Sequence, residues 1–111
     1  MPRFSKIEKE NIKKRLLSEG ENLFATYGLK KVTIDDLVES VNIAKATFYT
    51  FYENKEYLYL DIVQGIQNNI FTQLDRLLMS NSNLPSKVRV RQVFEKMSDL
   101  MVRYPILSQI D

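Results

Sequence analysis

The residues that could do chemistry gather between positions 33 and 55 of this 111-residue chain. One short stretch combines a lysine, two threonines, an alanine and a phenylalanine, namely Lys45, Ala46, Thr47, Thr50 and Phe51. Lysine and threonine side chains donate hydrogen bonds to base edges or phosphates, while methyl groups and aromatic rings contact thymine methyls or stack on bases. This combination is typical of a helix that enters the major groove of DNA and contacts bases.

Enzymatic chemistry is poorly supported by the residue types. The chain contains neither histidine nor cysteine, so it lacks the commonest general base, a thiolate nucleophile and the commonest ligands of transition metals. The acidic residues are scattered over helical segments, and no glycine-rich phosphate loop is present. We therefore expect no catalytic activity, no metal site and no cofactor.

Two short helices joined by a tight turn are predicted to position these residues. Thr33 and Asp36 have the spacing of a capping box, which opens a helix. An apolar stripe at helical spacing follows, formed by Ile34, Leu37, Val38 and Val41. Asn42 tolerates the left-handed conformation that ends a helix sharply, and a second helix is predicted from about Ala44 to Phe51. This pattern is a helix-turn-helix, whose second helix fits the DNA major groove.

The segment before this unit is predicted to form one long helix. Ser5 and Glu8 have the spacing of a second capping box, and Gly28 is placed to end the helix. Its inward stripe is predicted to comprise Ile12, Leu16, Leu23, Phe24 and Tyr27. Gly20 lies inside this helix, where glycine is unfavourable, so we expect another helix to approach closely there.

Two longer helices are predicted after the helix-turn-helix, which makes the fold all-α. The first, capped by Asn54, spans about 55–79, and residues 80–86 form a loop. Its apolar face is predicted to comprise Leu58, Ile62, Ile66, Ile70, Leu74 and Leu77, widened by Val63, Phe71 and Leu78 so that it packs on both sides. The second spans about 87–103 and ends at Tyr104-Pro105, with Pro105 opening a further helix. Its inward residues are predicted to be Val90, Val93, Phe94, Met97, Leu100 and Met101.

The order and spacing of these residues resemble the TetR family of transcriptional regulators over roughly residues 8 to 58. The resemblance rests on Leu23-Phe24, Tyr27-Gly28, Val32-Thr33, Asp36-Leu37, Asn42-Ile43, Lys45, Thr47-Phe48-Tyr49, Phe51-Tyr52, Asn54-Lys55-Glu56 and Leu58. Three positions depart from the family pattern, since Asn42 and Ala46 replace glycines and Ala44 replaces a capping serine. Loss of that cap removes about 1 kcal/mol and makes the start of the second helix less sharply defined.

The resemblance implies a set of contacts to DNA phosphates. Tyr49 and Lys55 resemble phosphate-binding residues of the family, and Lys55 also stands at a helix N-terminus, which attracts anions. Thr33 has a similar position at the start of the helix-turn-helix, although it could serve only as a cap. Lys30 and Lys31 are candidates for nonspecific backbone contact, as are Arg3 and Lys6 in the N-terminal arm. Without this motif, Lys45 and Lys55 would be interpreted as solvated charges.

The resemblance also implies a function and a division of the chain. Residues 1–54 would form the DNA-binding domain, and residues 55–111 the beginning of a helical ligand-binding and dimerisation domain. We expect this second domain to be incomplete, because the apolar stretch from Ile106 to Ile110 has nothing further in the chain to cover it. The implied function is a sequence-specific transcriptional regulator, most simply a repressor, that is a homodimer at full length. A small-molecule effector would release it from a palindromic operator in double-stranded DNA.

Charge and hydropathy are compatible with this interpretation but do not establish it. The net charge is only +2, and the basic excess lies entirely within residues 1–55. No apolar run approaches the ~20 residues that span a bilayer, and the N-terminus has no apolar secretory region. We expect a cytoplasmic protein without a membrane partner. A helical protein–protein interaction module remains the alternative function.

Overall fold

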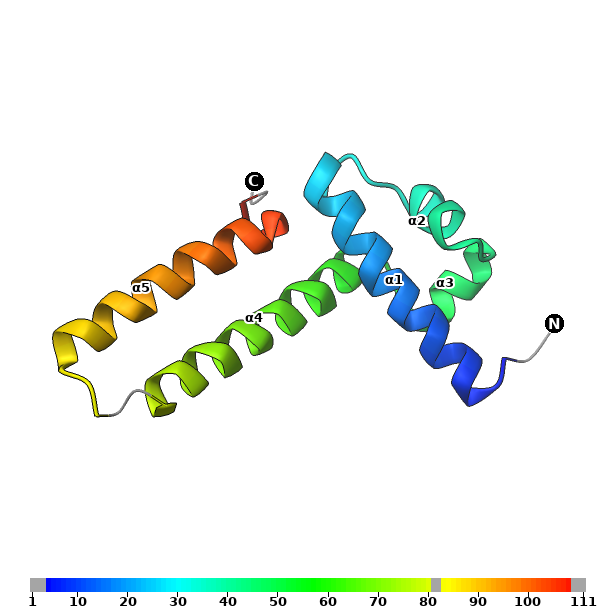
Figure 1. Ribbon diagram of the computed structural model, residues 1–111. Coiled ribbons are helices and arrows are strands. Elements are labelled where there is room, and N and C mark those ends of the chain that lie inside the picture. Colours follow the sequence, from blue (N-terminus) through cyan, green and yellow to red (C-terminus); the bar gives the residue numbers. More distant parts are fainter. Residues whose placement is uncertain (1–3, 81–82, 109–111) are drawn as a thin grey trace.

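The computed structural model describes residues 4–80 and 83–108, and every regular element in this part of the chain is helical. The elements are α1 (Lys6–Tyr27), α2 (Ile34–Val41), α3 (Lys45–Phe51), α4 (Lys55–Ser80), α5 (Ser86–Arg103) and the short 3₁₀ helix η1 (Pro105–Ser108). Helices α1 to α3 and the beginning of α4 form a head, from which α4 and α5 extend as an antiparallel pair (Figure 1). The predicted all-α fold is therefore confirmed.

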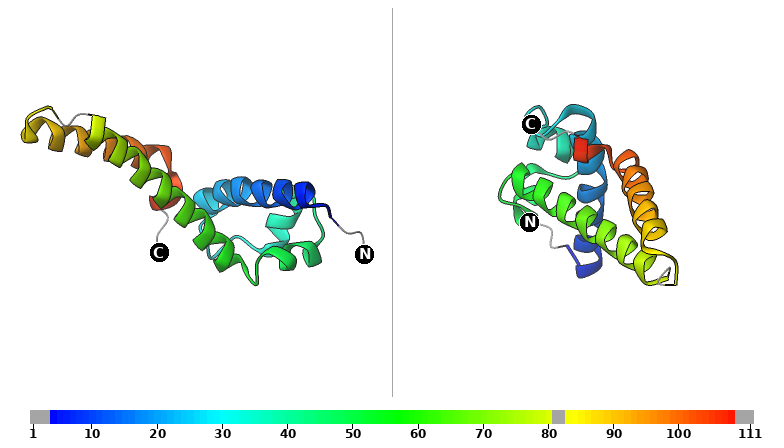
Figure 2. Two further views of the ribbon diagram at one scale, coloured as in Figure 1. Left: turned by 90° about the horizontal axis from the view of Figure 1, so that it is seen from below. Right: turned by 90° about the vertical axis from the view of Figure 1, so that its left-hand side faces the viewer.

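The molecule is elongated because α4 is shared between the head and the helix pair. It measures 60 × 32 × 18 Å along its principal axes. The views in Figure 2 show α4 running out of the head with α5 beside it.

The predicted ends of α1 are confirmed, and each depends on contacts within four residues. The Ser5 hydroxyl accepts a hydrogen bond from the Glu8 amide at 3.1 Å, and the Glu8 carboxylate accepts one from the Ser5 amide at 3.1 Å. At the other end, Gly28 has a φ of 84°, and its amide donates to the Phe24 carbonyl at 2.9 Å. A side chain at Gly28 would be strained, which explains the glycine.

The core of the head lies between α1, α2, α3 and the first half of α4. Its buried residues include Ile12, Leu16, Phe24, Leu37, Val41, Phe48, Leu58, Ile62 and Ile66. The predicted close approach at Gly20 is confirmed, because a Cβ there would lie 3.0 Å from Ile62 Cδ1 and 3.2 Å from Leu58 Cδ2. Tyr27, the last residue of α1, was predicted to face inward but is 58% exposed.

The apolar faces of α4 and α5 are covered on one side only. Leu74, Leu77, Val93 and Met97 are partly buried between the two helices. The predictions that Val90, Phe94 and Met101 face inward are wrong. Helix α4 contacts both α1 and α5, but Phe71 and Leu78, which were predicted to widen its packed face, are exposed. Phe71 and Phe94 are 75% and 70% exposed, because outside the head α4 and α5 pack on each other (Figure 1) and each buries one stripe.

The chain returns to the head after α5. Tyr104 ends α5, and Pro105 opens η1 as predicted. Ile106 is fully buried against the core of the head, and Leu107 is half-buried there. The expectation that this stretch lacks a covering surface is therefore wrong for both residues, while Gln109, Ile110 and Asp111 lie outside the described residues.

None of the helices in the described ranges is long and apolar enough to cross a membrane.

Candidate nucleic-acid interface

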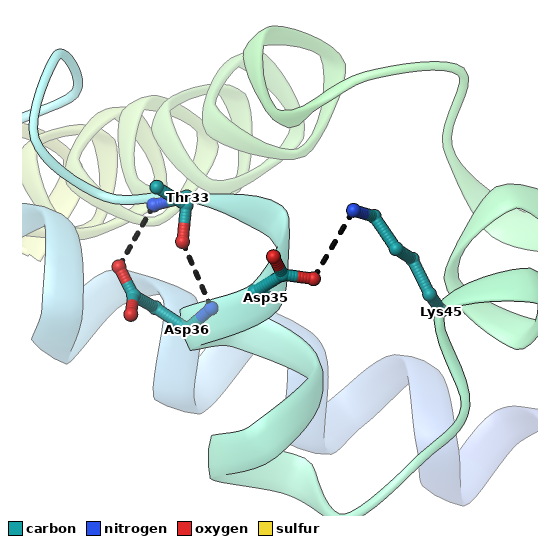
Figure 3. A network of polar contacts seen from close by, with 4 residues as sticks. All are labelled: Thr33, Asp35, Asp36 and Lys45. Carbon is teal, nitrogen blue, oxygen red and sulfur yellow. Dashed lines mark hydrogen bonds and ion pairs between the residues drawn. The ribbon is translucent and has the colours of Figure 1, made fainter.

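The helix-turn-helix begins at the predicted capping box of α2. The Thr33 amide donates to the Asp36 carboxylate at 2.9 Å, and the Asp36 amide donates to the Thr33 hydroxyl at 3.0 Å (Figure 3). The backbone hydrogen bond from Thr33, followed by its side-chain hydrogen bond, lowers the pKa of Asp36. The start of α2 is thus fixed by groups on the chain immediately around it.

The turn between α2 and α3 has the predicted left-handed residue. Asn42 adopts φ 57° and ψ 54°, and the amide of Ile43 donates to the Val38 carbonyl at 3.0 Å. Ala44 occupies the N-cap of α3 without a side-chain hydrogen bond. Helix α3 nevertheless begins at Lys45, next to the predicted start at Ala44, although its cap lacks a side-chain acceptor and is weaker.

Tertiary contacts hold α3 in place where its cap does not. Phe48 is fully buried in the core, with its ring centroid 5.9 Å from that of Tyr52. The Tyr52 hydroxyl donates to the Asp61 carboxylate on α4 at 2.6 Å. Burial, then the hydrogen bond to Asp61, raises the pKa of Tyr52. These contacts orient α3 so that its opposite face is directed to solvent.

Most of the predicted base-contacting residues lie on this solvent-facing side of α3. Lys45, Ala46 and Thr50 are exposed, and Thr47 is half-buried. The Thr50 hydroxyl donates to the Thr47 carbonyl at 2.6 Å, so its oxygen is left to accept from a base amino group. Phe51 differs from expectation, since it is half-buried against the core.

One open hollow brings together residues that were singled out separately in the sequence. It is lined by Thr33, Ile34, Asp35, Lys45, Tyr49, Asn54, Lys55 and Glu56. The predicted base contact Lys45 therefore shares a surface with the predicted phosphate contacts Thr33, Tyr49 and Lys55. The N-termini of α2 and α4 both lie at this hollow, because their first residues are part of its lining. Asn54 caps α4 by accepting from the Tyr57 amide at 2.9 Å. Helix N-termini favour anions.

The remaining predicted contacts lie beside the hollow or outside the described residues. Lys30 and Lys31 are exposed in the loop that leads to Thr33. Lys6 is exposed at the start of α1, whereas Arg3 lies outside the described residues. Within the described ranges, no three acidic residues form a cluster that could hold a metal ion.

Two lysines of the hollow have protein partners. The Lys45 ammonium lies 3.1 Å from the Asp35 carboxylate (Figure 3). The Lys55 ammonium donates to the carbonyls of Leu29, Lys30 and Val32 at 2.7, 3.2 and 2.9 Å. The two ammonium groups therefore have different surroundings, because Lys45 has one exposed ionic partner and Lys55 has three carbonyl partners.

Comparison with known proteins agrees with this geometry. Residues 16–62, from the middle of α1 to the first half of α4, match the family of bacterial regulatory proteins described as the tetR family. The head of this chain matches the TetR family. The match covers α2, α3 and the hollow of this TetR-family head, so the resemblance inferred from the sequence is confirmed.

Two curated relatives resemble this chain over different lengths. The biofilm operon icaADBC HTH-type negative transcriptional regulator IcaR of Staphylococcus epidermidis is 37% identical over 57 residues, which cover 51% of this chain and 31% of that protein. The regulator of the same name from Staphylococcus aureus strain Newman is 29% identical over 96 residues, covering 84% of this chain and 50% of that protein. The chain thus spans about half the length of its curated relatives at most. No solved structure gives a significant match.

Sequence reasoning missed two features of the TetR-family head. Asp35 was not singled out, because an acid in the first turn of a helix is ordinarily explained by the helix dipole. The carbonyl partners of Lys55 were also missed, since backbone carbonyls carry no sequence signal. The second feature could have been suspected from the position of Lys55, because a lysine in the first turn of a helix opposes the dipole and needs compensation.

Proposed function

We propose that this chain is the DNA-binding end of a sequence-specific transcriptional repressor. The observation that carries the proposal is the shared hollow of Thr33, Lys45 and Tyr49, which joins the exposed start of α3 to two helix N-termini. Support also comes from the TetR-family head and from the relatives, whose names describe negative transcriptional regulators. A surface of this kind suits a duplex, where bases and phosphates lie close together.

In this proposal α3 lies in the major groove. Lys45 at its first turn donates to guanine O6 or N7, and Ala46 allows close approach to a thymine methyl. Thr47 and Thr50 contact bases along the same face, and Phe51 reaches the groove with the exposed part of its ring. These contacts provide sequence discrimination.

Phosphate contacts fix the register of the head on the duplex. We propose Thr33 and Tyr49 at the hollow, with Lys30 and Lys31 beside it. Each of these side chains is exposed, so each can reach a phosphate without unfolding any element. Lys55 was predicted to join this set, but its three carbonyl partners distinguish it from these exposed side chains.

At full length the protein would be a homodimer that reads a palindromic operator with half-sites about one helical turn apart, or a multiple of this. Residues 1–54 would form the DNA-binding domain and residues 55–111 the opening helices of the regulatory domain. A small-molecule effector in that domain would change the spacing of the two heads by a population shift. Helix α4 supports this coupling, because Leu58, Ile62 and Ile66 are buried in the head while the helix continues to Ser80.

The test is binding of a fluorescently labelled random-sequence duplex pool, measured by anisotropy at two salt concentrations, followed by sequencing of the bound fraction. The proposal predicts salt-sensitive binding with recovery of a palindromic motif. Recovery of a single half-site would indicate heads that do not pair in this chain.

Absence of binding at low salt would overturn the proposal. The result would then favour a helical protein–protein interaction module, to which the exposed Phe71, Phe94 and Val102 of α4 and α5 would contribute.

A further inference from the structure

The ammonium of Lys55 is saturated by the protein itself. A lysine ammonium has three donors, and those of Lys55 point to the carbonyls of Leu29, Lys30 and Val32 at 2.7, 3.2 and 2.9 Å. These carbonyls belong to the loop between α1 and α2, at a sequence distance of 23 to 26 residues. The contact therefore joins the first residue of α4 to the loop before α2.

The location of Lys55 explains why these acceptors are needed. Lys55 is the first residue of α4 and is half-buried. A positive charge there opposes the helix dipole, and its partial removal from water is unfavourable without hydrogen-bond partners. Three converging carbonyls offset both effects, since hydrogen bonds to charged groups are stronger than those between neutral groups. Lys55 is thus not a solvated charge with donors free to bind a ligand.

We infer that Lys55 is a positioning residue that holds the loop 29–32 against the start of α4 and does not bind a DNA phosphate. The loop carries the exposed Lys30 and Lys31 and leads directly to Thr33, the N-cap of α2. Lys55 therefore sets where these proposed phosphate contacts stand relative to α4. This inference rests on the proposed function only for its consequence in DNA binding.

The direct test observes the lysine ammonium groups of the wild-type chain by nitrogen-15 NMR at low temperature. We expect the Lys55 ammonium to exchange slowly with water in the free protein, and its signal to stay unchanged when a random-sequence duplex is added. Lys31 is the internal control, because its exposed ammonium should exchange fast and shift on DNA addition. A Lys55 signal that exchanges as fast as that of Lys31, or moves on adding DNA, would overturn the inference.

A pair of variants separates positioning from phosphate binding. Lys55→Met keeps most of the aliphatic stem and removes the donors, and Lys31→Met makes the same change at an exposed lysine in the loop. The amide of Val32, which donates to the Gly28 carbonyl at 3.3 Å, reports closure of the loop. In Lys55→Met its hydrogen exchange should accelerate by about tenfold or more, whereas Lys31→Met should leave it unchanged.

The salt dependence of DNA binding tests the same distinction. Lys31→Met should lower the slope of log affinity against log salt by about 0.9, the value of one lost phosphate contact. Lys55→Met should lower the slope only through the loop lysines, so in a Lys30→Met/Lys31→Met background it should leave the slope unchanged. Unchanged Val32 exchange together with a lowered slope in Lys55→Met would assign Lys55 to a phosphate. Failure of the wild type to bind any duplex would instead reject the proposed function, because the amide and ammonium measurements on the free protein need no DNA.

Discussion

The carboxylate of Asp35 lies 3.1 Å from the ammonium of Lys45, so the first turn of α2 neutralises the first residue of α3. Helix α3 has no acidic residue in its first turn and no side-chain cap, and Lys45 is placed against its dipole. Asp35 supplies the missing negative charge from the neighbouring helix. Both side chains remain exposed, at 73% and 53%, so the pair is worth no more than about 1 kcal/mol and is weakened by salt.

The first prediction concerns Asp35. Because Asp35 lines the same hollow as Lys45, its carboxylate competes with DNA for the ammonium and repels phosphates. Asp35→Asn should raise affinity for a random duplex by about two- to fivefold at low salt, the range expected for an exposed ion pair. Anisotropy titration measures this directly.

Glu39→Gln is the matched control, since Glu39 is another exposed acid of α2 that lines a different hollow. In a Lys45→Ala background the gain from Asp35→Asn should fall to that of Glu39→Gln. Equal gains from the two substitutions in the wild-type background would mean that only net charge matters.

A second prediction separates Lys45 from Lys31. Both side chains are exposed, but Lys45 begins α3 and Lys31 stands in the loop before α2. Lys45→Ala should change which sequences are selected from a random duplex pool, whereas Lys31→Ala should weaken binding to all sequences alike. Sequencing of the bound fractions measures this difference. An unchanged motif in Lys45→Ala would show that Lys45 does not contact the bases.

The third prediction concerns acid stability through Asp36. Its lowered pKa means that the unfolded chain binds more protons than the folded one near the ordinary carboxyl value of 3.8, so stability falls as the pH drops through this value and below it. Asp36→Asn should reduce this acid-dependent loss in urea unfolding followed by circular dichroism. Asp35→Asn is the control, and an acid profile of Asp36→Asn that matches the wild type would contradict the role of the capping box.

The fourth prediction concerns Tyr52 and alkaline stability. Tyr52→Phe removes the hydrogen bond to Asp61 and should lower the free energy of unfolding by about 1 kcal/mol at neutral pH. The raised pKa of Tyr52 means that the unfolded chain loses its proton first, so wild-type stability declines as the pH rises above the ordinary value of 10.0. The gap between wild type and Tyr52→Phe should therefore shrink at alkaline pH.

Urea titrations at neutral and alkaline pH measure the Tyr52 effect, with Tyr49→Phe as the exposed control. A constant gap at both pH values would show that Tyr52 titrates alike in the folded and unfolded chains.

The fifth prediction compares two helical glycines. A Cβ at Gly65 meets nothing within 4 Å, whereas one at Gly20 would lie 3.0 Å from Ile62 Cδ1. Gly65→Ala should raise the free energy of unfolding by up to about 1 kcal/mol through helix propensity. Gly20→Ala should fall short of that gain by about 1 kcal/mol or more, because α4 must shift. Equal stabilisation in thermal unfolding would mean that the contact between α1 and α4 is loosely packed.

Sequence-based prediction was most accurate where the deciding contacts are local. The capping boxes at Ser5 and Thr33, the glycine stop at Gly28 and the left-handed Asn42 were all foreseen, and the structure confirms each of them. Their hydrogen bonds join residues at most five positions apart, so residue types and spacing are enough to predict them. The helices of the head and the family resemblance were also predicted correctly, because both rest on the spacing of residues along the chain.

Side-chain surroundings were predicted less well, because amphipathic periodicity identifies an apolar stripe without saying what covers it. Phe94 and Ile106 are the clearest cases, since Phe94 is 70% exposed and Ile106 is fully buried, the reverse of expectation. The difference arises because α5 packs mainly on α4 and leaves its other side exposed, while η1 returns to pack on the head. Only the relative placement of the helices decides this.

The sequence alone determined that this chain is all-α, where its helices begin and end, and which residues face solvent at the start of α3. The tertiary structure decided that Thr33, Lys45, Tyr49 and Lys55 share one hollow, that Asp35 neutralises Lys45, and that Lys55 is held by the loop before α2. The physical reason is the range of the interactions. Helix caps and periodicity act within one or two turns, whereas an ammonium selects its partners from whatever acceptors the fold brings within about 3 Å.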